Sequence, residues 1–319
     1  MADSDRNELG ILGTAKYIDI DLGNLNDFEI TLDLDDWDKS FCNYNYLFYS
    51  NNTEYGGIIE DIKVDTKANT IKHKGYTWRG LLTQKIIEPP NGLSYLNVTG
   101  DANTIIQSLI GTTFGDLVVV DDVISGFAIN YQFPRYINLL DGVNKMLSMV
   151  GAKLKLYFVN EDMKVHIQAV SIIDYSDELE YSQDQLINFN TRDYRRGINH
   201  LICLGGGELT EREVIHLYLQ EDGTIGSEQF YFGLSERVTT FDYANAEDTS
   251  SLIESGINRF KELLNYTELS MSIDEIEADL GDIVGGRERV TGLSMRKPIV
   301  QKILKVTGNN ISIEFKVGD

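Results

Sequence analysis

Alternating hydrophobic and polar positions dominate residues 1–90. Apolar side chains recur at every second position in two runs, 18–22 and 28–34, and the residues between them, 23–27, suit a turn. This period of two predicts an antiparallel hairpin with one face in water. Further apolar runs at 44–49 and 58–64 predict two more strands. About five or six short strands within roughly ninety residues favour a barrel or sandwich over a parallel sheet.

The first β module is predicted to end within residues 74–90. Tyr76 and Trp78 are two positions apart, so on an extended chain they would share one face. Gly75 and Gly80 leave room for the backbone to bend or for another strand to approach, as at the corner of a small barrel. The two prolines at the end of the segment cannot donate to the hydrogen bonds of a sheet, so the module is expected to stop there.

Helical spacing replaces the alternation in residues 91–184. Asp101 is placed to cap a helix that Gly111 would end, and a second helix is predicted over 137–150, before another glycine. Alternation returns in 154–169, which predicts a hairpin around a polar turn. The middle block is therefore predicted to be an α+β unit.

A third module is predicted over residues 185–319, after an acidic stretch at 174–184 that resembles a solvated linker. Its expected elements are, in order, strands at 198–204 and 213–220, a helix at 247–265, and a closing hairpin of 298–306 and 311–317. The predicted fold is α+β and β-rich, with β modules at 1–90 and 185–319 flanking a smaller mixed module at 91–184.

The composition fits a soluble protein of roughly two or three domains. The chain has 319 residues, of which 42% are hydrophobic and 24% charged, and no apolar run approaches the ~20 residues of a membrane helix. The first residues lack the basic and apolar regions of a secretion signal, so we expect the chain to begin in a cytoplasm.

The net charge of −22 argues against a nucleic-acid-binding surface, which needs clustered lysine and arginine. Residues 1–38 hold eleven carboxylates against Arg6 and Lys16. A surface of that sign would repel a polyanion passing close to it. Acidity that simply aids solubility is the alternative explanation.

Candidate metal-binding and phosphate-binding motifs are incomplete. Residues 33–38 are similar to the start of a calcium loop, but they lack its glycine at the sixth position, and Tyr44 stands where the closing glutamate belongs. Gly205 to Gly207 follow a predicted strand, without the GxGxxG pattern or the lysine of phosphate-binding loops. We favour a solvated acidic turn for residues 33–38 and a bulge or wide turn for Gly205 to Gly207.

The histidines and cysteines form no recognisable ligand set. These residues are scattered along the chain: His73, His166, His200, His216, Cys42 and Cys203. We expect the histidines to be exposed or half-buried strand residues and the cysteines to be small core side chains, rather than ligands. A distant carboxylate pair, as in glycosidases, stays open among 50 acidic residues. The 17 tyrosines could stack on sugars, but core and subunit contacts explain them more simply. The sequence predicts no catalytic, cofactor-binding or metal-binding residue.

Three groups of motifs carry a resemblance to a known family. Residues 75–90, with their Trp-x-Gly-Leu-Leu core and closing prolines, resemble a segment of the hub proteins of phage tails and phage-tail-like particles. Residues 199–208 with Arg212 resemble the strand that opens the second barrel of those proteins. The C-terminal part is similar to the end of the hubs of defective Bacillus-type prophages and related contractile particles, at 280–284, 299–303 and 314–318.

The resemblance implies a baseplate hub with two tube-like β-barrel domains, 1–90 and 185–319, flanking an α/β domain at 91–184. In that family three copies form a ring whose six barrels continue the six-fold tail tube, while its threefold underside carries the spike. The implied partners are the tail tube protein, the spike protein and other baseplate proteins. A tape measure protein or DNA would pass through the lumen without specific binding. The expected location is the baseplate of a virion or bacteriocin-like particle, assembled in the bacterial cytoplasm.

Two other functions stay open at this point. A cell-wall or polysaccharide hydrolase of a tail would need carboxylates that the sequence does not single out. A receptor-binding tail module is the third possibility, which binding to a glycan array would distinguish. The resemblance favours a homotrimeric structural hub that is not an enzyme, uses no cofactor and does not insert into a membrane.

Overall fold

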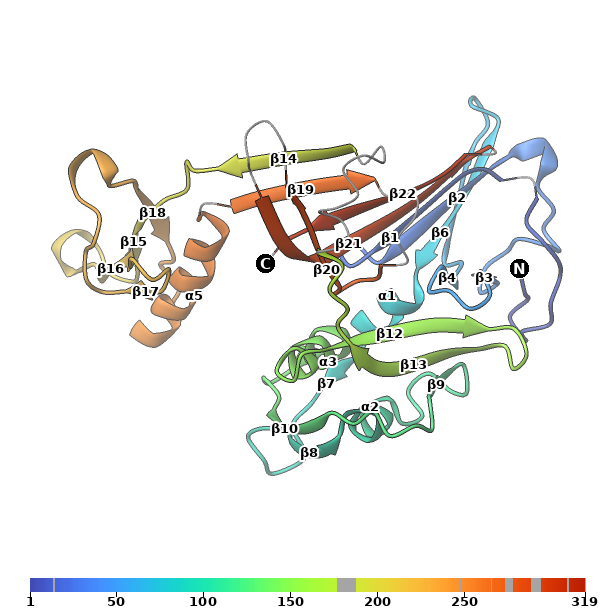
Figure 1. Ribbon diagram of the computed structural model, residues 1–319, viewed down its shortest axis with the longest axis horizontal. Coiled ribbons are helices and arrows are strands. Elements are labelled where there is room, and N and C mark those ends of the chain that lie inside the picture. Colours follow the sequence, from blue (N-terminus) through green and yellow to red (C-terminus); the bar gives the residue numbers. More distant parts are fainter. Residues whose placement is uncertain are drawn as a thin grey trace. The chain divides into compact units, whose positions relative to one another are not determined.

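The computed structural model describes residues 1–13, 15–176, 188–246, 248–264, 266–272, 278–287, 294–308 and 310–318 (Figure 1). The chain divides into two units. The first unit combines Met1–Phe189 with Ser270–Asp319, and the second unit is Asn190–Leu269. The second unit is therefore an insertion into the C-terminal part of the first. No helix among the described residues is long and apolar enough to span a membrane.

One antiparallel sheet of the first unit joins the start of the chain to its end. The strands of this sheet that come from the two ends of the chain follow the order β22 (Asn310–Val317), β21 (Ser294–Thr307), β1 (Ala15–Leu22), β2 (Asp27–Asp33), β6 (Thr70–Tyr76) and β5 (Asp61–Asp65), with β20 (Ile283–Arg287) also paired to β21. Ile20 is opposite Phe28 on β2 and Leu304 on β21. Because Ile20, Phe28 and other alternate positions are buried, one face of these strands builds the core. The predicted hairpins at both ends of the chain are confirmed.

Helix α1 (Trp78–Thr83) corrects the interpretation of residues 74–90. Strand β6 ends at Tyr76, and Trp78 begins the helix, so the prediction that Tyr76 and Trp78 share a strand face is wrong. The hydroxyl of Thr77 accepts the backbone N–H of Gly80 at 3.2 Å and caps this helix. Trp78 is 1% exposed and stacks on Phe158, with the ring centroids 5.4 Å apart.

The expected close approach at Gly75 is confirmed. A Cβ atom at this position would lie 1.8 Å from the backbone oxygen of Ile58, which no real side chain could tolerate. The short strand β7 (Ile86–Ile87) follows α1 and ends before the two prolines.

The predicted strand at 58–64 is wrong as a single element. Strand β4 (Gly56–Ile58) pairs with β3 (Leu47–Tyr49), which is shorter than the predicted run at 44–49, and β5 begins at Asp61 in the main sheet. The backbone changes partners between these strands: the N–H of Ile59 donates to Tyr46, and the N–H of Glu60 donates to Lys74. Continuous alternation in the sequence does not reveal such a change of sheet.

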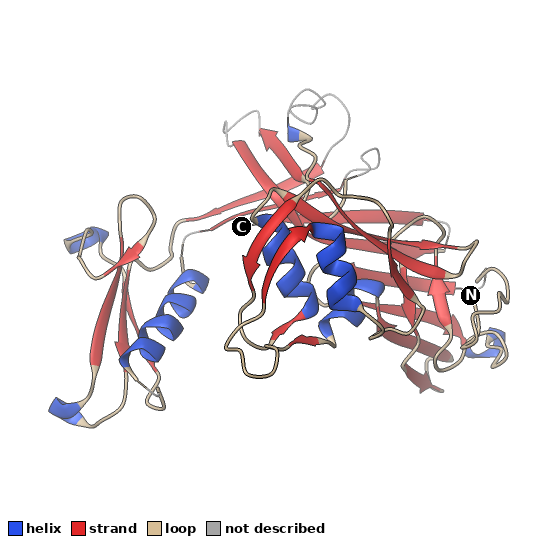
Figure 2. Ribbon diagram, turned by 90° about the horizontal axis from the view of Figure 1, so that it is seen from below, coloured by secondary structure: helices blue, strands red, loops and turns tan. Residues whose placement is uncertain are grey.

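Helices α2 (Ala102–Ile110) and α3 (Leu139–Ser148) pack against a three-stranded sheet (Figure 2). That sheet contains the predicted hairpin, β12 (Ala152–Val159) and β13 (Lys164–Ser171), with the short parallel strand β9 (Val118–Val120) beside β13. The side chain of Asp101 accepts the N–H of Asn103, and Gly111 follows the last turn of α2 at a φ of +50°. Both helix predictions are confirmed.

Two strand pairs of this layer were not predicted. Strand β8 (Asn97–Asp101) pairs with β10 (Ala128–Gln132), and β7 pairs with β11 (Ile137–Asn138). The side chains of this layer form one core with Trp78 and Leu82 of α1.

The second unit has a four-stranded sheet and one helix. Its strand order is β17 (Ile225–Gly226), β16 (Val214–Leu219), β15 (His200–Leu204) and β18 (Val238–Asp242), and helix α5 (Thr249–Glu262) covers one face. Leu201, Cys203 and Leu217 from the sheet meet Leu252 and Phe260 from the helix. The predicted helix and both predicted strands of this region are confirmed. Strands β14 (Asn188–Tyr194) and β19 (Tyr266–Ser272) are neighbours and lead into and out of this region.

The prediction of a β-rich α+β protein is confirmed. No sheet formed by the described residues closes into a barrel, and two tube-like domains with boundaries near 90 and 184 stay a prediction. Most of the predicted acidic linker, 177–184, lies outside the described residues.

Candidate functional site

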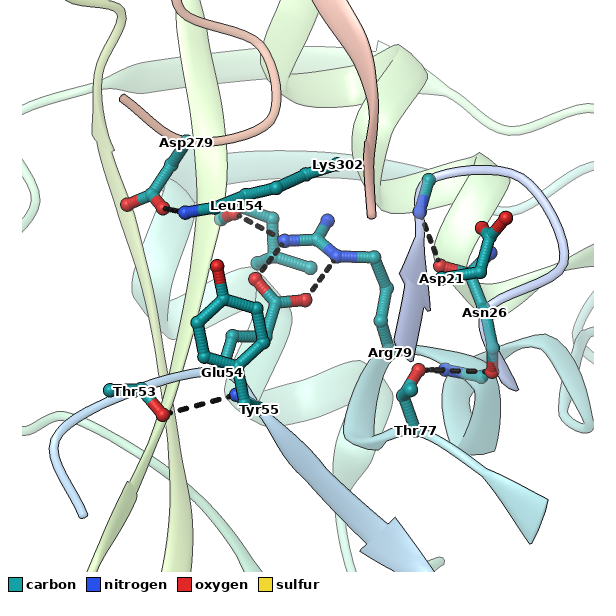
Figure 3. A network of polar contacts seen from close by, with 12 residues as sticks. Asp21, Asn26, Thr53, Glu54, Tyr55, Thr77, Arg79, Leu154, Asp279 and Lys302 are labelled. Atoms are coloured by element: carbon teal, nitrogen blue, oxygen red, sulfur yellow. Dashed lines mark hydrogen bonds and ion pairs between the residues drawn. The ribbon is translucent and has the colours of Figure 1, made fainter. Parts of the chain in front are cut away.

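A buried ion pair joins helix α1 to the loop between β3 and β4. Nε and Nη2 of Arg79 donate to the two carboxylate oxygens of Glu54, at 2.5 and 2.9 Å (Figure 3). Nη2 also donates to the backbone oxygen of Leu154 on β12, at 3.1 Å. The side chains of Arg79 and Glu54 are only 5% and 12% exposed. The arrangement fixes the guanidinium on three sides in a place with little water.

A second ion pair, Lys302 with Asp279, lies beside the first (Figure 3). Nζ of Lys302 lies 2.9 Å from Asp279 and 3.0 Å from the backbone oxygen of Ala278. Burial alone would lower the pKa of Lys302, but Tyr55 and Asp279 outweigh it and raise the pKa. The ammonium also lies over the rings of Tyr55 and Phe315. The ammonium group of Lys302, on strand β21, is therefore largely buried, and Asp279 neutralises its charge.

A third ion pair, Lys153 with Asp282, is buried more deeply. The charged atoms are 2.6 Å apart, and the side chains are 8% and 1% exposed. Asp282 also accepts the backbone N–H groups of Ile173 and Asp279. Because an unpaired buried charge is costly, the Arg79–Glu54 and Lys153–Asp282 pairs fix the arrangement of α1, β12 and the C-terminal segment strongly, whereas Asp279, at 44% exposed, is partly open to water.

A cleft of about 820 Å³ opens beside these ion pairs, wholly within the first unit. Arg79 and Lys153 line it from the side of the network. Its other walls come from the β1–β2 turn, the end of α1, one side of α3, and the segments 280–281 and 298–300. The described lining contains neither histidine nor cysteine, so this cleft offers no imidazole base and no thiol.

The structure brings two of the four histidines together. Nε2 of His200 lies 2.8 Å from Nδ1 of His216 on the neighbouring strand, and Nδ1 of His200 lies 2.7 Å from Glu236. Sequence reasoning missed this pair, although both residues fell on strands that were predicted as consecutive. Because the two rings bind each other, their facing nitrogens are not free to share a metal ion.

The other two histidines differ sharply in their surroundings. His73 is fully buried on β6, neither ring nitrogen has a partner, and burial lowers its pKa to about 4. His166 lies between Asp121 and Asp162, at 2.6 and 3.0 Å. Burial alone would lower the pKa of His166, but the hydrogen bonds to the two carboxylates raise it. Both are strand residues, as predicted, but the expectation of an exposed or half-buried position is wrong for His73.

The remaining sequence candidates are turns. Residues 33–38 contain the 3₁₀ turn Leu34–Asp36, and Gly205 to Gly207 form a turn before a second 3₁₀ segment, Leu209–Glu211. Strand β16 follows that turn, as predicted, whereas a helix follows the turn in phosphate-binding loops. In the described part of the chain, no group of three or more histidine, cysteine or acidic side chains could hold a metal ion.

Comparison with solved structures identifies the fold. It is similar over 99% of this chain to prophage tail protein gp18 from Listeria monocytogenes EGD-e, with a TM-score of 0.50, 12% identity and 93% of that chain covered. The chain shares its fold with a prophage tail protein. No protein-family model and no curated protein sequence matches the chain.

Two further structures are similar at lower scores. A tail protein from Neisseria meningitidis MC58 has a TM-score of 0.49 at 12% identity, with 96% of this chain and 92% of that chain covered. The 43 kDa tail protein of prophage MuSo2 from Shewanella oneidensis has a TM-score of 0.47 at 13% identity, with 95% and 92% covered.

Proposed function

We propose that this chain is a structural hub protein in the baseplate of a phage tail or a phage-tail-like contractile particle. The observation that carries the proposal is the fold shared with a prophage tail protein along 99% of the chain. The motifs at 75–90, 199–208 and the C-terminal segment support the same family from the sequence. The role is mechanical: three copies form a ring that joins the six-fold tail tube to the threefold spike.

The exposed edge of the main sheet supports assembly into a closed ring. Strand β5 ends the strand order, and four of its five residues are exposed. A free sheet edge invites pairing with another chain, and closed cyclic symmetry is a common way to cover such edges. In the proposed trimer, two tube-like domains per chain supply the six walls that a six-fold tube needs. Other baseplate proteins would surround the ring, and DNA or a tape measure protein would pass through it.

The proposed hub is not an enzyme. The arginine and the lysine that line the cleft neutralise carboxylates, and His200 binds His216, so these side chains are used in contacts that build the fold. The rival function is a cell-wall hydrolase. Incubating the purified chain with peptidoglycan and measuring released fragments separates the two, since the hub releases none.

Labelling isolated tail particles tests the proposed location directly. Particles produced with a peptide-tagged copy of the chain are stained with gold-coupled antibody and imaged by electron microscopy. The hub places gold at one end of the tail tube in every labelled particle. Gold along the tube, on fibres, or only on free protein would contradict the proposed role.

A further inference from the structure

Arg79 lines the cleft in the first unit, and one nitrogen of its guanidinium group has no hydrogen-bond partner among the described residues. Nε and Nη2 of Arg79 are bonded to Glu54 and Leu154, whereas Nη1 donates to no residue in the described part of the chain (Figure 3). Arg79 lines the cleft although its side chain is 5% exposed. Glu54 already neutralises the charge, so the group best suited to Nη1 is a neutral acceptor such as a carbonyl oxygen.

The walls of the cleft combine uncharged polar groups with aliphatic side chains. Five carboxamide side chains line the cleft, and two of them, Asn26 and Asn138, accept backbone N–H groups of this chain. The other three, Asn24, Gln84 and Asn144, come from the β1–β2 turn, the end of α1 and the exposed side of α3. The aliphatic lining residues include Leu25, Leu140, Ile172, Leu280, Ile299 and Val300. Carboxamides both donate and accept hydrogen bonds, as peptide groups require.

The charges at the cleft favour a neutral occupant. Lys153 is paired with Asp282, and Arg79 is paired with Glu54. Asp141 accepts a hydrogen bond from the side chain of Asn138 at 2.6 Å and keeps its charge, but it is exposed, so water screens it and a basic segment would gain little there. A strongly acidic segment would find no unpaired cation among the described residues of these walls. A cleft of about 820 Å³ with apolar walls and a few fixed polar groups falls within the usual range for ligand sites.

We propose that this cleft receives a short, uncharged peptide segment of a partner protein. An aliphatic side chain of that segment packs among the apolar wall residues, and one of its carbonyl oxygens accepts a hydrogen bond from Nη1 of Arg79. A sugar fits less well, because the described lining has one aromatic residue, Tyr76, which is half-buried. This inference rests on the proposed function, since it names the chemistry by which the hub holds a neighbour.

Asn144 and Lys145 provide a matched pair of variants. Both residues are exposed on α3, but only Asn144 lines the cleft. Asn144→Trp fills the cleft without touching the core, and Lys145→Trp places the same bulk outside it. A library of short random peptides displayed on yeast is selected against the purified wild-type chain, and enriched peptides are synthesised and titrated against all three proteins.

The expected result is a set of peptides with an uncharged centre and an aliphatic residue. Their Kd rises at least about tenfold with Asn144→Trp and stays unchanged with Lys145→Trp. Peptides that bind both variants equally, or no enrichment over the Asn144→Trp chain, would overturn the proposal. If the wild-type chain binds a glycan and only Asn144→Trp abolishes that binding, the cleft is a sugar site. If only Asn144→Trp abolishes self-association, the occupant of the cleft is a second copy of the chain. Both results overturn the peptide assignment.

The particle-labelling experiment and the peptide-binding experiment test separate claims, so a negative result in one leaves the other claim standing. Gold at the tail end without cleft-dependent peptide binding removes this inference and leaves the hub role. Cleft-dependent peptide binding without label on tail particles removes the hub role and leaves a peptide site.

Discussion

Glu54 lies 2.5 Å from Nε of Arg79, at a position where the two side chains are 12% and 5% exposed. This contact connects a loop of the first strands to helix α1, and through Leu154 it reaches β12. A pair with so little access to water is far more sensitive to the loss of one partner than an exposed pair. The stability of the first unit should therefore depend strongly on it.

Glu54→Gln should lower the free energy of unfolding by about 3–5 kcal/mol, because it leaves the buried guanidinium without a counter-charge. Urea denaturation followed by circular dichroism measures the change. The matched control is Glu262→Gln, which breaks the exposed Arg259–Glu262 pair of α5, with side chains 47% and 62% exposed. That change should cost about 0.5 kcal/mol or less. Equal effects of the two substitutions would contradict the importance of burial at Arg79.

His73 should make the protein less stable in acid. Its pKa is about 4 in the folded chain and 6.5 in the unfolded chain, so unfolding takes up a proton between these values. Stability is therefore complete above about pH 6.5 and falls as the pH drops to 4, by up to about 3 kcal/mol. His73→Leu removes this dependence, and its stability relative to wild type should rise as the pH falls. A difference that is the same at pH 8 and pH 4.5 would show that His73 does not titrate in this way.

His166 should act in the opposite direction. Its pKa is raised in the folded chain by Asp121 and Asp162, so its stabilising contribution is complete below the unfolded pKa and fades as the pH rises through the folded pKa. His166→Gln should cost most at about pH 6 and least at alkaline pH. Urea midpoints measured across that range test the sign, and a cost that grows with pH would refute it.

Gly75→Ala should be strongly destabilising. The added Cβ would meet the backbone oxygen of Ile58 at 1.8 Å, so the two strands must separate. We expect a loss of at least about 2 kcal/mol. Gly151→Ala is the control, since Gly151 has a φ of +67° and a Cβ added there would meet no atom within 4 Å, so only backbone strain of roughly 1 kcal/mol should result. Thermal unfolding of both variants distinguishes a close approach from conformational strain.

Local signals predicted a large part of the fold. Asp101 and Gly111 bound α2 as capping chemistry requires, and alternation located the hairpin of β12 and β13. Helix α1 was missed because it has only six residues, and its apolar positions also fit a strand. Its one local signal was Thr77, a capping residue whose role depends on the turn that follows.

Long-range partners could not be predicted in this way. The alternation of β1 is compatible with any neighbouring strand, and nothing in it indicates pairing with β21 at the other end of the chain. The ion pair between Glu54 and Arg79 likewise has no fixed spacing in sequence, because a loop and a helix supply its partners. The cleft could therefore not be found before the fold was known.

The mass of the purified chain in solution tests the central claim most directly. Native mass spectrometry at micromolar concentration should detect a species of about 108 kDa, three times the 36.0 kDa of one chain, and electron microscopy of the same sample should show rings with a central opening. A species of 36.0 kDa at every concentration, with no ring in the images even when tail tube protein is added, would contradict the trimeric hub.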